Sequence, residues 1–152
     1  MGGYNHSQAR VPAQLKRMQD LDKRAVCAFC RENVETETTS VIEFETEHWI
    51  VKANDYPYER TKLHLLLIAK SHARTVTDLS PEAQADFLPL VARVERHYKL
   101  PSYAVAMRSG DFTYNGGTVD HLHAHIIVGD PKHPDPDPVR FKVSSRPKTT
   151  DA

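Results

Sequence analysis

The stretch His121-Leu122-His123-Ala124-His125-Ile126-Ile127-Val128 decides how the chain is organised. Three histidines alternate in it with apolar residues, and an aliphatic run follows. In an extended strand successive side chains point to opposite faces, so the three imidazoles are predicted to share one face at a repeat of about 6.5–7 Å. Leu122, Ala124 and Ile126 then face the core. Because each buried imidazole needs partners for its ring nitrogens, the pattern favours catalysis or metal binding over a run of exposed histidines.

The overall composition indicates one globular domain without a strong field of either charge. The chain has 152 residues, with 20 lysines and arginines against 20 aspartates and glutamates. A balanced charge gives no general attraction to nucleic acid or to an anionic membrane, so any phosphate binding is expected to be local. The apolar run over 65–69 is far too short to span a membrane, and residues 1–6 lack the pattern of a signal peptide. We therefore expect a cytoplasmic protein.

Both cysteines of the chain lie in one short turn, Cys27-Ala28-Phe29-Cys30. In a reducing compartment this spacing suggests a metal site or a redox pair rather than a structural disulfide. Two thiolates leave a zinc ion short of its usual four ligands, which histidine commonly completes. The nine histidines of the chain offer several candidates.

Hydrophobic periodicity and capping signals predict two long helices. Val11, Leu15, Met18 and Leu21 follow the spacing of one helix face, which predicts a helix over 11–23. Ser80 as N-cap and Pro81 at the first helical position predict the start of a second helix that runs to about residue 99.

The remaining segments read as short strands, turns and tails. Alternating or continuous apolar residues predict strands, which we place at 41–45, 48–52, 63–68, 103–108 and the histidine stretch. Polar and glycine-rich segments predict a surface loop over 31–39 and a turn over 109–117. Prolines indicate extended structure over 131–138, and the few apolar anchors that follow predict a flexible tail over 139–152.

In combination, the motifs resemble those of the histidine triad (HIT) superfamily of nucleotide hydrolases and transferases. The cysteine turn, then Asn54-Asp55-Tyr56-Pro57-Tyr58, then the strand from His64 to His72, then the triad stretch follow the family's order. The resemblance implies an α+β fold with an antiparallel sheet and flanking helices, and a homodimer. It divides the chain into an N-terminal tail and helix at 1–24, a HIT-like catalytic domain at 25–130, and a Pro-rich segment with a basic tail at 131–152.

The resemblance also implies catalytic roles. His123 is then the nucleophile that attacks the α-phosphorus of a nucleotide and forms a nucleotidyl-histidine intermediate. His125 and His64 hold phosphate oxygens or help to protonate the leaving group. Backbone amides near Gly117 and Thr118, with the Thr118 hydroxyl, donate to charge that develops on the non-bridging oxygens.

Family members with the two-cysteine turn hold a structural zinc, and the resemblance implies which residues bind it here. They are Cys27, Cys30, His72 and His121, a Cys2His2 set suited to tetrahedral zinc. Two buried cysteines without a metal are the alternative, since cysteine is also a common core residue. A zinc ion would tie the N-terminal segment to the strand that presents His123.

The implied substrate is a purine nucleotide, with adenosine the expected nucleoside, and the implied activity is hydrolysis of a phosphoramidate or phosphoanhydride bond. Asn54 resembles the family's ribose-binding residue, although an ordinary turn asparagine is the alternative. Its surroundings resemble the phosphorylase and nucleotidyltransferase branches, whereas His125 is usual in hydrolases, so a dinucleoside polyphosphate phosphorylase or nucleotidyltransferase stays open. A non-catalytic nucleotide-binding protein is a further alternative. Nucleic-acid binding is not expected, because the charge after residue 130 is only slightly basic.

Overall fold

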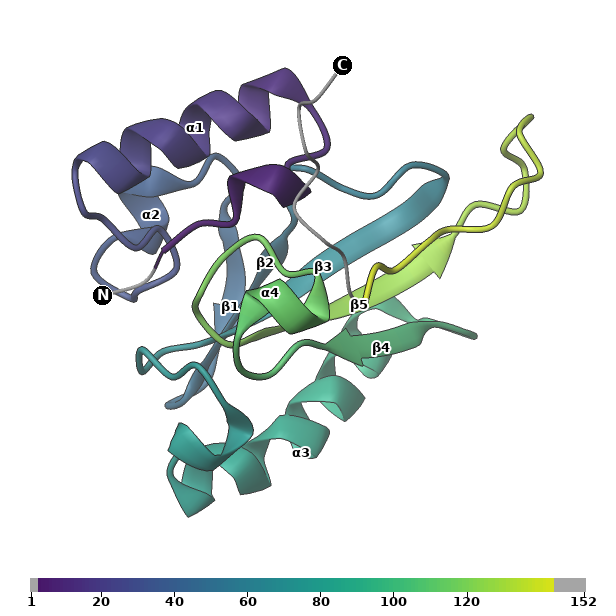
Figure 1. Cartoon of the computed structure of the whole chain (residues 1–152). Coiled ribbons are helices and arrows are strands. Elements are labelled where there is room, and N and C mark those ends of the chain that lie inside the picture. The colour runs from purple at the N-terminus through teal and green to yellow at the C-terminus, as the bar shows by residue number, and fades with distance from the viewer. Residues whose placement is uncertain (1–2, 144–152) are drawn as a thin grey trace.

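Five strands form one antiparallel sheet in the computed structural model, which describes residues 3–143. The order across the sheet is β1-β2-β3-β5-β4 (Figure 1). The strands are β1 (Ile42–Glu45), β2 (Trp49–Ala53), β3 (Thr61–Ala69), β4 (Ala104–Met107) and β5 (His123–Gly129). The helices are α1 (Pro12–Lys23), α2 (Val34–Glu37), α3 (Pro81–Tyr98) and α4 (Phe112–Asn115), with short 3-10 turns η1 (His6–Gln8) and η2 (Val76–Asp78). The predicted α+β fold is confirmed.

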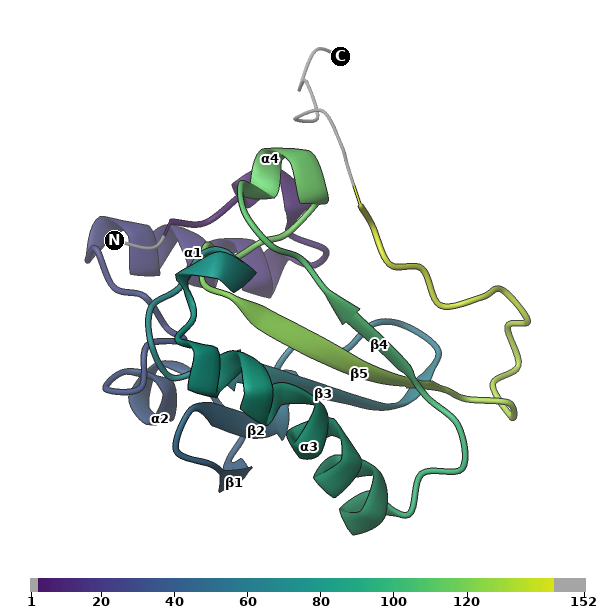
Figure 2. The same ribbon diagram turned by 90° about the horizontal axis from the view of Figure 1, so that it is seen from below.

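Helices cover both faces of this sheet. Figures 1 and 2 show α1 on one side of the sheet and α3 on the other. Leu65 and Leu67 of β3 pack into the core beneath α3, whereas Leu66 and Ile68 pack toward α2 on the opposite face. The alternation along β3 therefore divides the core into two layers. Among the described residues, no helix is both long enough and apolar enough to cross a membrane.

The two long helices begin where the sequence signals place them. The hydroxyl of Ser80 accepts a hydrogen bond from the amide of Ala83, and Pro81 occupies the first helical position of α3. In α1, Met18 and Leu21 are buried one turn apart. Burying two such side chains stabilises the docked helix by about 1.5–3 kcal/mol each.

Two predicted loops contain short helices instead. The predicted loop over 31–39 includes α2, because the fully buried Val34 packs against the Leu66 face of the sheet. The predicted turn over 109–117 includes α4, whose first turn is capped by the Asp111 carboxylate and which ends at Gly116, where φ is 73°. Glycine adopts this left-handed conformation without strain, so the helix ends there.

Both flanking segments pack on the face of the sheet that carries the histidines. The Tyr4 hydroxyl donates to the carbonyl of Val26 and accepts from the amide of Ala28. Phe141 and Lys142, which fall within the predicted tail, contact Arg108 beside the site. The rest of that predicted tail, 144–152, lies outside the described residues.

Candidate active site and metal centre

Three histidine side chains come together where β3 and β5 pair. The register sets Leu66 opposite His125 and Ile68 opposite His123, and residues directly opposite in an antiparallel pair point to the same face. His64, Leu66 and Ile68 share that face, as the alternation of β3 predicts. His64, His123 and His125 are all buried there, on the side covered by α1.

The backbone holds His123 in a single tautomer. Its Nδ1 lies 2.7 Å from the carbonyl oxygen of His121, and because a carbonyl only accepts, Nδ1 carries the proton. Nε2 therefore keeps its lone pair. Burial lowers the pKa of His123 to about 4, although the bond to His121 opposes the shift. At neutral pH the imidazole is uncharged, and Nε2 can act as a nucleophile.

His64 and His125 form a directed hydrogen-bonded chain. The amide of Tyr58 donates to Nδ1 of His64 over 3.0 Å, so the proton of His64 is on Nε2. That Nε2 donates to Nδ1 of His125 over 2.8 Å. His125 consequently carries its own proton on Nε2. One backbone amide thus fixes the tautomers of two imidazoles.

The chain ends in an unpaired donor. Within residues 3–143, Nε2 of His125 is buried and has no hydrogen-bond partner. Burial also lowers the pKa of His64 to about 4 and that of His125 well below 6.5. Both rings are therefore neutral at pH 7. A buried N–H without a partner is rare, and this one is suited to a ligand oxygen.

His121 does not share the strand of the other two triad histidines. Strand β5 begins at His123, and the prediction that all three imidazoles share one strand face is wrong for His121. The backbone bends before the strand, where the Leu122 amide donates to the carbonyl of Ala73. Nε2 of His121 lies 2.7 Å from the carbonyl oxygen of Ala69, so this nitrogen carries the proton and Nδ1 remains free.

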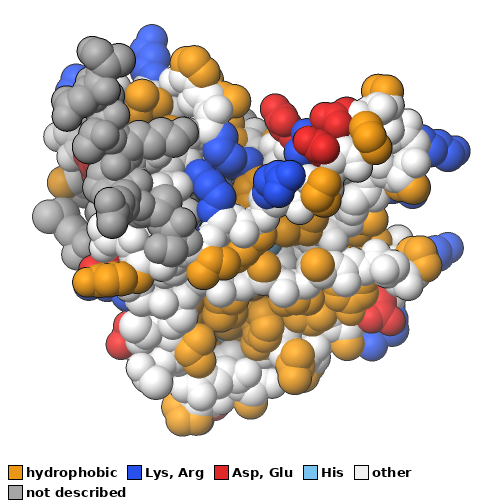
Figure 3. Space-filling view, turned by 45° about the vertical axis from the view of Figure 1, so that its right-hand side comes forward, with side chains coloured by type: hydrophobic (Ala, Val, Ile, Leu, Met, Phe, Trp, Pro, Cys, Tyr) orange, Lys and Arg blue, Asp and Glu red, His pale blue; other side chains and the backbone are white. Residues whose placement is uncertain are grey.

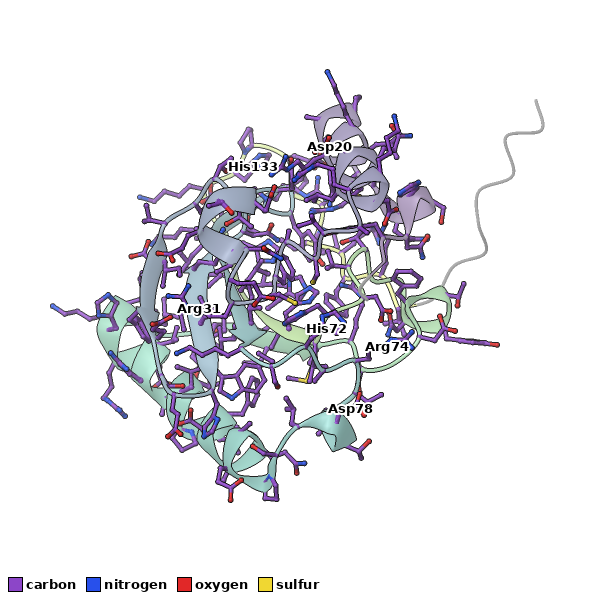
Figure 4. All side chains as sticks on the ribbon, turned by 90° about the vertical axis from the view of Figure 1, so that its left-hand side faces the viewer. Asp20, Arg31, His72, Arg74, Asp78 and His133 are labelled. Atoms are coloured by element: carbon purple, nitrogen blue, oxygen red, sulfur yellow. The ribbon has the colours of Figure 1, made fainter. Side chains whose placement is uncertain are left out.

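The free Nδ1 of His121 faces the three other predicted metal ligands. It lies 3.4 Å from Sγ of Cys27, 3.8 Å from Sγ of Cys30 and 3.1 Å from Nδ1 of His72. His72 Nδ1 lies 3.2 Å from Sγ of Cys30, and all four atoms lie within 4.8 Å of one another. Tetrahedral zinc, with bonds of about 2.0–2.3 Å, separates its ligand atoms by about 3.3–3.8 Å. The set fits such an ion; His72 is labelled near the centre of Figure 4.

The predicted substrate-binding residues differ in whether their hydrogen-bond donors already have partners within the protein. Oδ1 of Asn54 accepts from the amide of Tyr56, while its Nδ2 lies 3.3 Å from Nε2 of His64. Because both of these nitrogens are donors, the contact leaves the Asn54 protons for a ligand. The amide of Gly117 already donates to Asn115. Thr118 lines the same cavity as Asn54, His123 and His125.

This cavity lies between the N-terminal segment and the histidine face of the sheet. Its walls include Met18 and Leu21 of α1, Phe29 of the cysteine turn and Leu66 of β3. Apolar walls with a few buried polar groups are typical of small-molecule sites. Because α1 forms one wall, the N-terminal segment belongs to the site as well as to the fold.

Two arginines beside the histidines were not predicted from the sequence. Arg108, just after β4, donates from Nε and Nη2 to the carbonyl of Lys142, and its guanidinium lies 3.7 Å from the ring centre of Phe141. Arg10 stacks 4.4 Å over the ring of Tyr58. Both cations help to lower the pKa of His64 and His125. In the sequence, the signal that could have identified Arg108 is its position, a positive charge where the predicted strand meets the glycine-rich turn.

Comparison with known proteins identifies the family. Residues 35–132, more than half of the chain, match the model of the HIT domain. The chain belongs to the HIT family. The cysteine turn and α1 precede the matched region, so in this HIT protein two of the four candidate metal ligands and one wall of the cavity lie outside it.

Curated relatives and solved structures agree with this assignment. The HIT protein is 40% identical over 67 residues to adenosine 5′-monophosphoramidase of Schizosaccharomyces pombe, covering 44% of this chain and 49% of that one. It is 29% identical over 103 residues to adenosine 5′-monophosphoramidase of Saccharomyces cerevisiae, and the match covers 68% of this chain and 62% of that one. The chain thus spans about half to three fifths of the length of these two relatives. A Zn-bound histidine triad family protein from Mycobacterium smegmatis superposes with a TM-score of 0.53 at 26% identity. The superposition covers 76% of this chain and 81% of that one.

Proposed function

We propose that this HIT protein hydrolyses a phosphoramidate or phosphoanhydride bond at the α-phosphate of a purine nucleotide, with His123 as the nucleophile. The observation that carries the proposal is the bond from Nδ1 of His123 to the carbonyl of His121, which leaves a neutral Nε2 for attack. The names of both curated relatives, adenosine 5′-monophosphoramidases, support a purine nucleoside and a phosphoramidate bond.

The proposed reaction has two displacements at phosphorus. In the first, Nε2 of His123 bonds to the α-phosphorus as the bond to the leaving amine breaks. In the second, water attacks the same phosphorus, the phosphorus–nitrogen bond to His123 breaks, and a nucleoside 5′-monophosphate leaves. The proton lost by this water replaces the proton that departs with the amine. Two moderate barriers then replace one high barrier.

Neighbouring groups are proposed to hold the phosphate during both steps. The unpaired Nε2–H of His125 donates to a phosphate oxygen or to the leaving atom, and His64 fixes the tautomer that makes this donor available. Asn54 offers its free Nδ2 protons to the ribose, and the Thr118 hydroxyl offers a donor to the phosphate. Gly117 contributes the tight turn before Thr118, since its amide is already bound.

Zinc is the cofactor that we propose for the cluster of Cys27, Cys30, His72 and His121. The four donor atoms have the spacing and the chemistry of a closed structural zinc site, and a solved neighbour is named as Zn-bound. When bound, the ion supplies a crosslink between the cysteine turn and the segment before β5. The free state of both cysteines also suits a reducing compartment, which supports our proposal of a cytoplasmic protein.

A homodimer joined through strand β4 is proposed for the assembly. Strand β4 is one of the two edges of the sheet, and its Val105 side chain is 43% exposed. Figure 3 shows hydrophobic side chains gathered on the face turned to the viewer, in the region of β4 and α3. An edge strand with an exposed apolar side chain favours pairing with a second copy of the same chain.

A direct assay tests the proposed activity. Purified protein is mixed with adenosine 5′-phosphoramidate, and the release of AMP and ammonia is followed with and without added phosphate. We expect release in plain buffer at a rate that phosphate does not change. A strict requirement for phosphate would instead identify a phosphorylase, and the absence of turnover with every nucleoside phosphoramidate would refute the hydrolase proposal.

A further inference from the structure

Lys52 lies in the same row across the sheet as His125. The register pairs Lys52 with Leu66 and Leu66 with His125, so all three point to the face covered by α1. Adjacent strands are about 4.8 Å apart, which places Lys52 about 10 Å from His125 across β3. Lys52 and His125 line one cavity. A nucleotide with its phosphate at the histidines can thus extend its base over Leu66 toward Lys52.

The ammonium of Lys52 is buried and, within the described residues, uses two of its three N–H donors in hydrogen bonds. Its side chain is 1% exposed, although lysine is rarely buried to this degree. Nζ donates to Oγ1 of Thr38 over 2.7 Å and to Oδ1 of Asp55 over 3.1 Å. An ammonium has three protons, and within residues 3–143 the third makes no hydrogen bond. This proton is a donor available to a ligand in the cavity.

Gln14 adds a second donor to the same cavity. The residue is 6% exposed, and Oε1 accepts from the amide of Arg10 over 2.8 Å. Because an amide N–H donates to it, this atom is the side-chain oxygen of Gln14. The Nε2 amino group is therefore the end of the side chain that points to other partners. Its protons make no hydrogen bond to any part of the described chain. The two buried side chains therefore present free N–H donors, while Oε1 of Gln14 already accepts one hydrogen bond and the ammonium of Lys52 accepts none.

The two carboxylates beside them already accept several hydrogen bonds each. The Asp55 carboxylate accepts from the amides of Thr39 and Ser40 as well as from Lys52. The Glu37 carboxylate accepts from Arg17 and Arg24. A ligand group in this part of the cavity thus meets N–H donors, and an acceptor on the ligand is favoured over another donor.

From this pattern, we propose that Lys52 and Gln14 select a purine with a carbonyl oxygen at position 6, as in guanosine and inosine, over adenosine. This proposal rests on the proposed nucleotide hydrolase function and names its preferred base. In the proposed complex position 6 of the base lies against these two donors. The carbonyl oxygen of guanine or hypoxanthine accepts there, whereas the amino group of adenine would place a donor against donors and leave buried groups unpaired. Sites with such polar matching discriminate strongly against the mismatched analogue.

The test compares inosine and adenosine 5′-phosphoramidates, which differ only around position 6. We expect kcat/KM for inosine to exceed that for adenosine at least about tenfold, with guanosine close to inosine. Equal values, or a preference for adenosine, would overturn the proposal while leaving the hydrolase function intact. If no phosphoramidate is turned over, the hydrolase function fails, and the affinities for inosine and adenosine 5′-monophosphates decide the base preference in the same way.

Two variants assign the preference to these residues. Lys52→Met removes the ammonium and should reduce the inosine-to-adenosine ratio to within about threefold of unity. Gln14→Glu replaces the free donor with an acceptor and should shift the ratio toward adenosine, even if Lys52→Met fails to fold. The control is Lys62→Met, at an exposed position of β3, which should keep the wild-type ratio. Unchanged ratios in a folded Lys52→Met and in Gln14→Glu would refute the assignment.

Discussion

Nδ1 of His123 donates over 2.7 Å to the carbonyl oxygen of His121, whose own imidazole faces Cys27, Cys30 and His72. The backbone of one candidate metal ligand therefore sets the tautomer of the proposed nucleophile. A zinc ion that fixes His121 would also fix the carbonyl on which His123 depends. The candidate metal site and the proposed catalytic site are consequently joined through the backbone of His121.

Replacing the proposed nucleophile should abolish turnover without unfolding the protein. His123→Ala is expected to reduce kcat/KM for a nucleoside phosphoramidate by at least about a thousandfold, because no other side chain replaces Nε2. Nucleotide binding should persist, since phosphate and base contacts remain. His133→Ala, at an exposed site, serves as the control. Turnover by His123→Ala within tenfold of wild type would eliminate His123 as the nucleophile.

Loss of one metal ligand should remove zinc and destabilise the fold. Cys30→Ser breaks the four-ligand set, and we expect native mass spectrometry to show wild-type protein with zinc and the variant without it. The variant should unfold at lower temperature, because the crosslink between the cysteine turn and His121 is lost. His48→Ala lies outside the cluster and should retain the metal. A Cys30→Ser protein with full zinc content would disprove the assignment.

Stability should decline as pH falls from about 6.5 to about 4, in part because of His64. Burial holds the pKa of His64 near 4 in the folded chain, while the unfolded chain binds the proton near 6.5. The unfolded state thus binds more protons within this window. As pH falls from about 6.5 to about 4, the contribution of His64 therefore lowers the free energy of unfolding by up to about 3 kcal/mol. Above pH 6.5 the contribution is complete.

Urea unfolding between pH 4.5 and 7.5 measures this effect. His64→Gln should flatten the dependence of the unfolding free energy on pH, whereas His133→Gln at an exposed position should leave it unchanged. Identical slopes for wild type and His64→Gln would show that His64 titrates alike in both states.

The edge of the sheet can be tested by placing a charge on it. Val105→Lys puts an ammonium in the middle of β4, where pairing with a second copy would bury it. We expect light scattering to report a dimer for wild type and a monomer for this variant. Val41→Lys, 73% exposed beside the opposite edge strand β1, should remain a dimer. A monomeric wild type would refute the proposed assembly.

Local signals predicted much of the scaffold and the residues of the candidate site. Alternation along β3 placed His64 and Leu66 on one face, and the Ser80 cap with Pro81 placed the start of α3. These features depend on neighbours within a few residues, which sequence periodicity records. The resemblance to the family supplied the proposed roles of the histidines, and the structure brings Cys27, Cys30, His72 and His121 together.

Features that depend on distant contacts were not predicted. The bend that turns His121 away from the strand is set by Ala69 and Ala73, about 50 residues away in sequence. Phe141 was assigned to a tail, yet it contacts Tyr58 and His125 across the site. Lys52 resembled the polar end of a strand, and only its pairing with Thr38 and Asp55 explains its burial.

Intact-protein mass spectrometry with peptide mapping, after rapid mixing with a nucleoside phosphoramidate and acid-free quenching, tests the central claim most directly. We expect a transient mass increase of one nucleoside monophosphate, located on His123 and absent from His123→Ala. Turnover with the nucleotidyl group on another residue, or turnover without any such adduct, would contradict it.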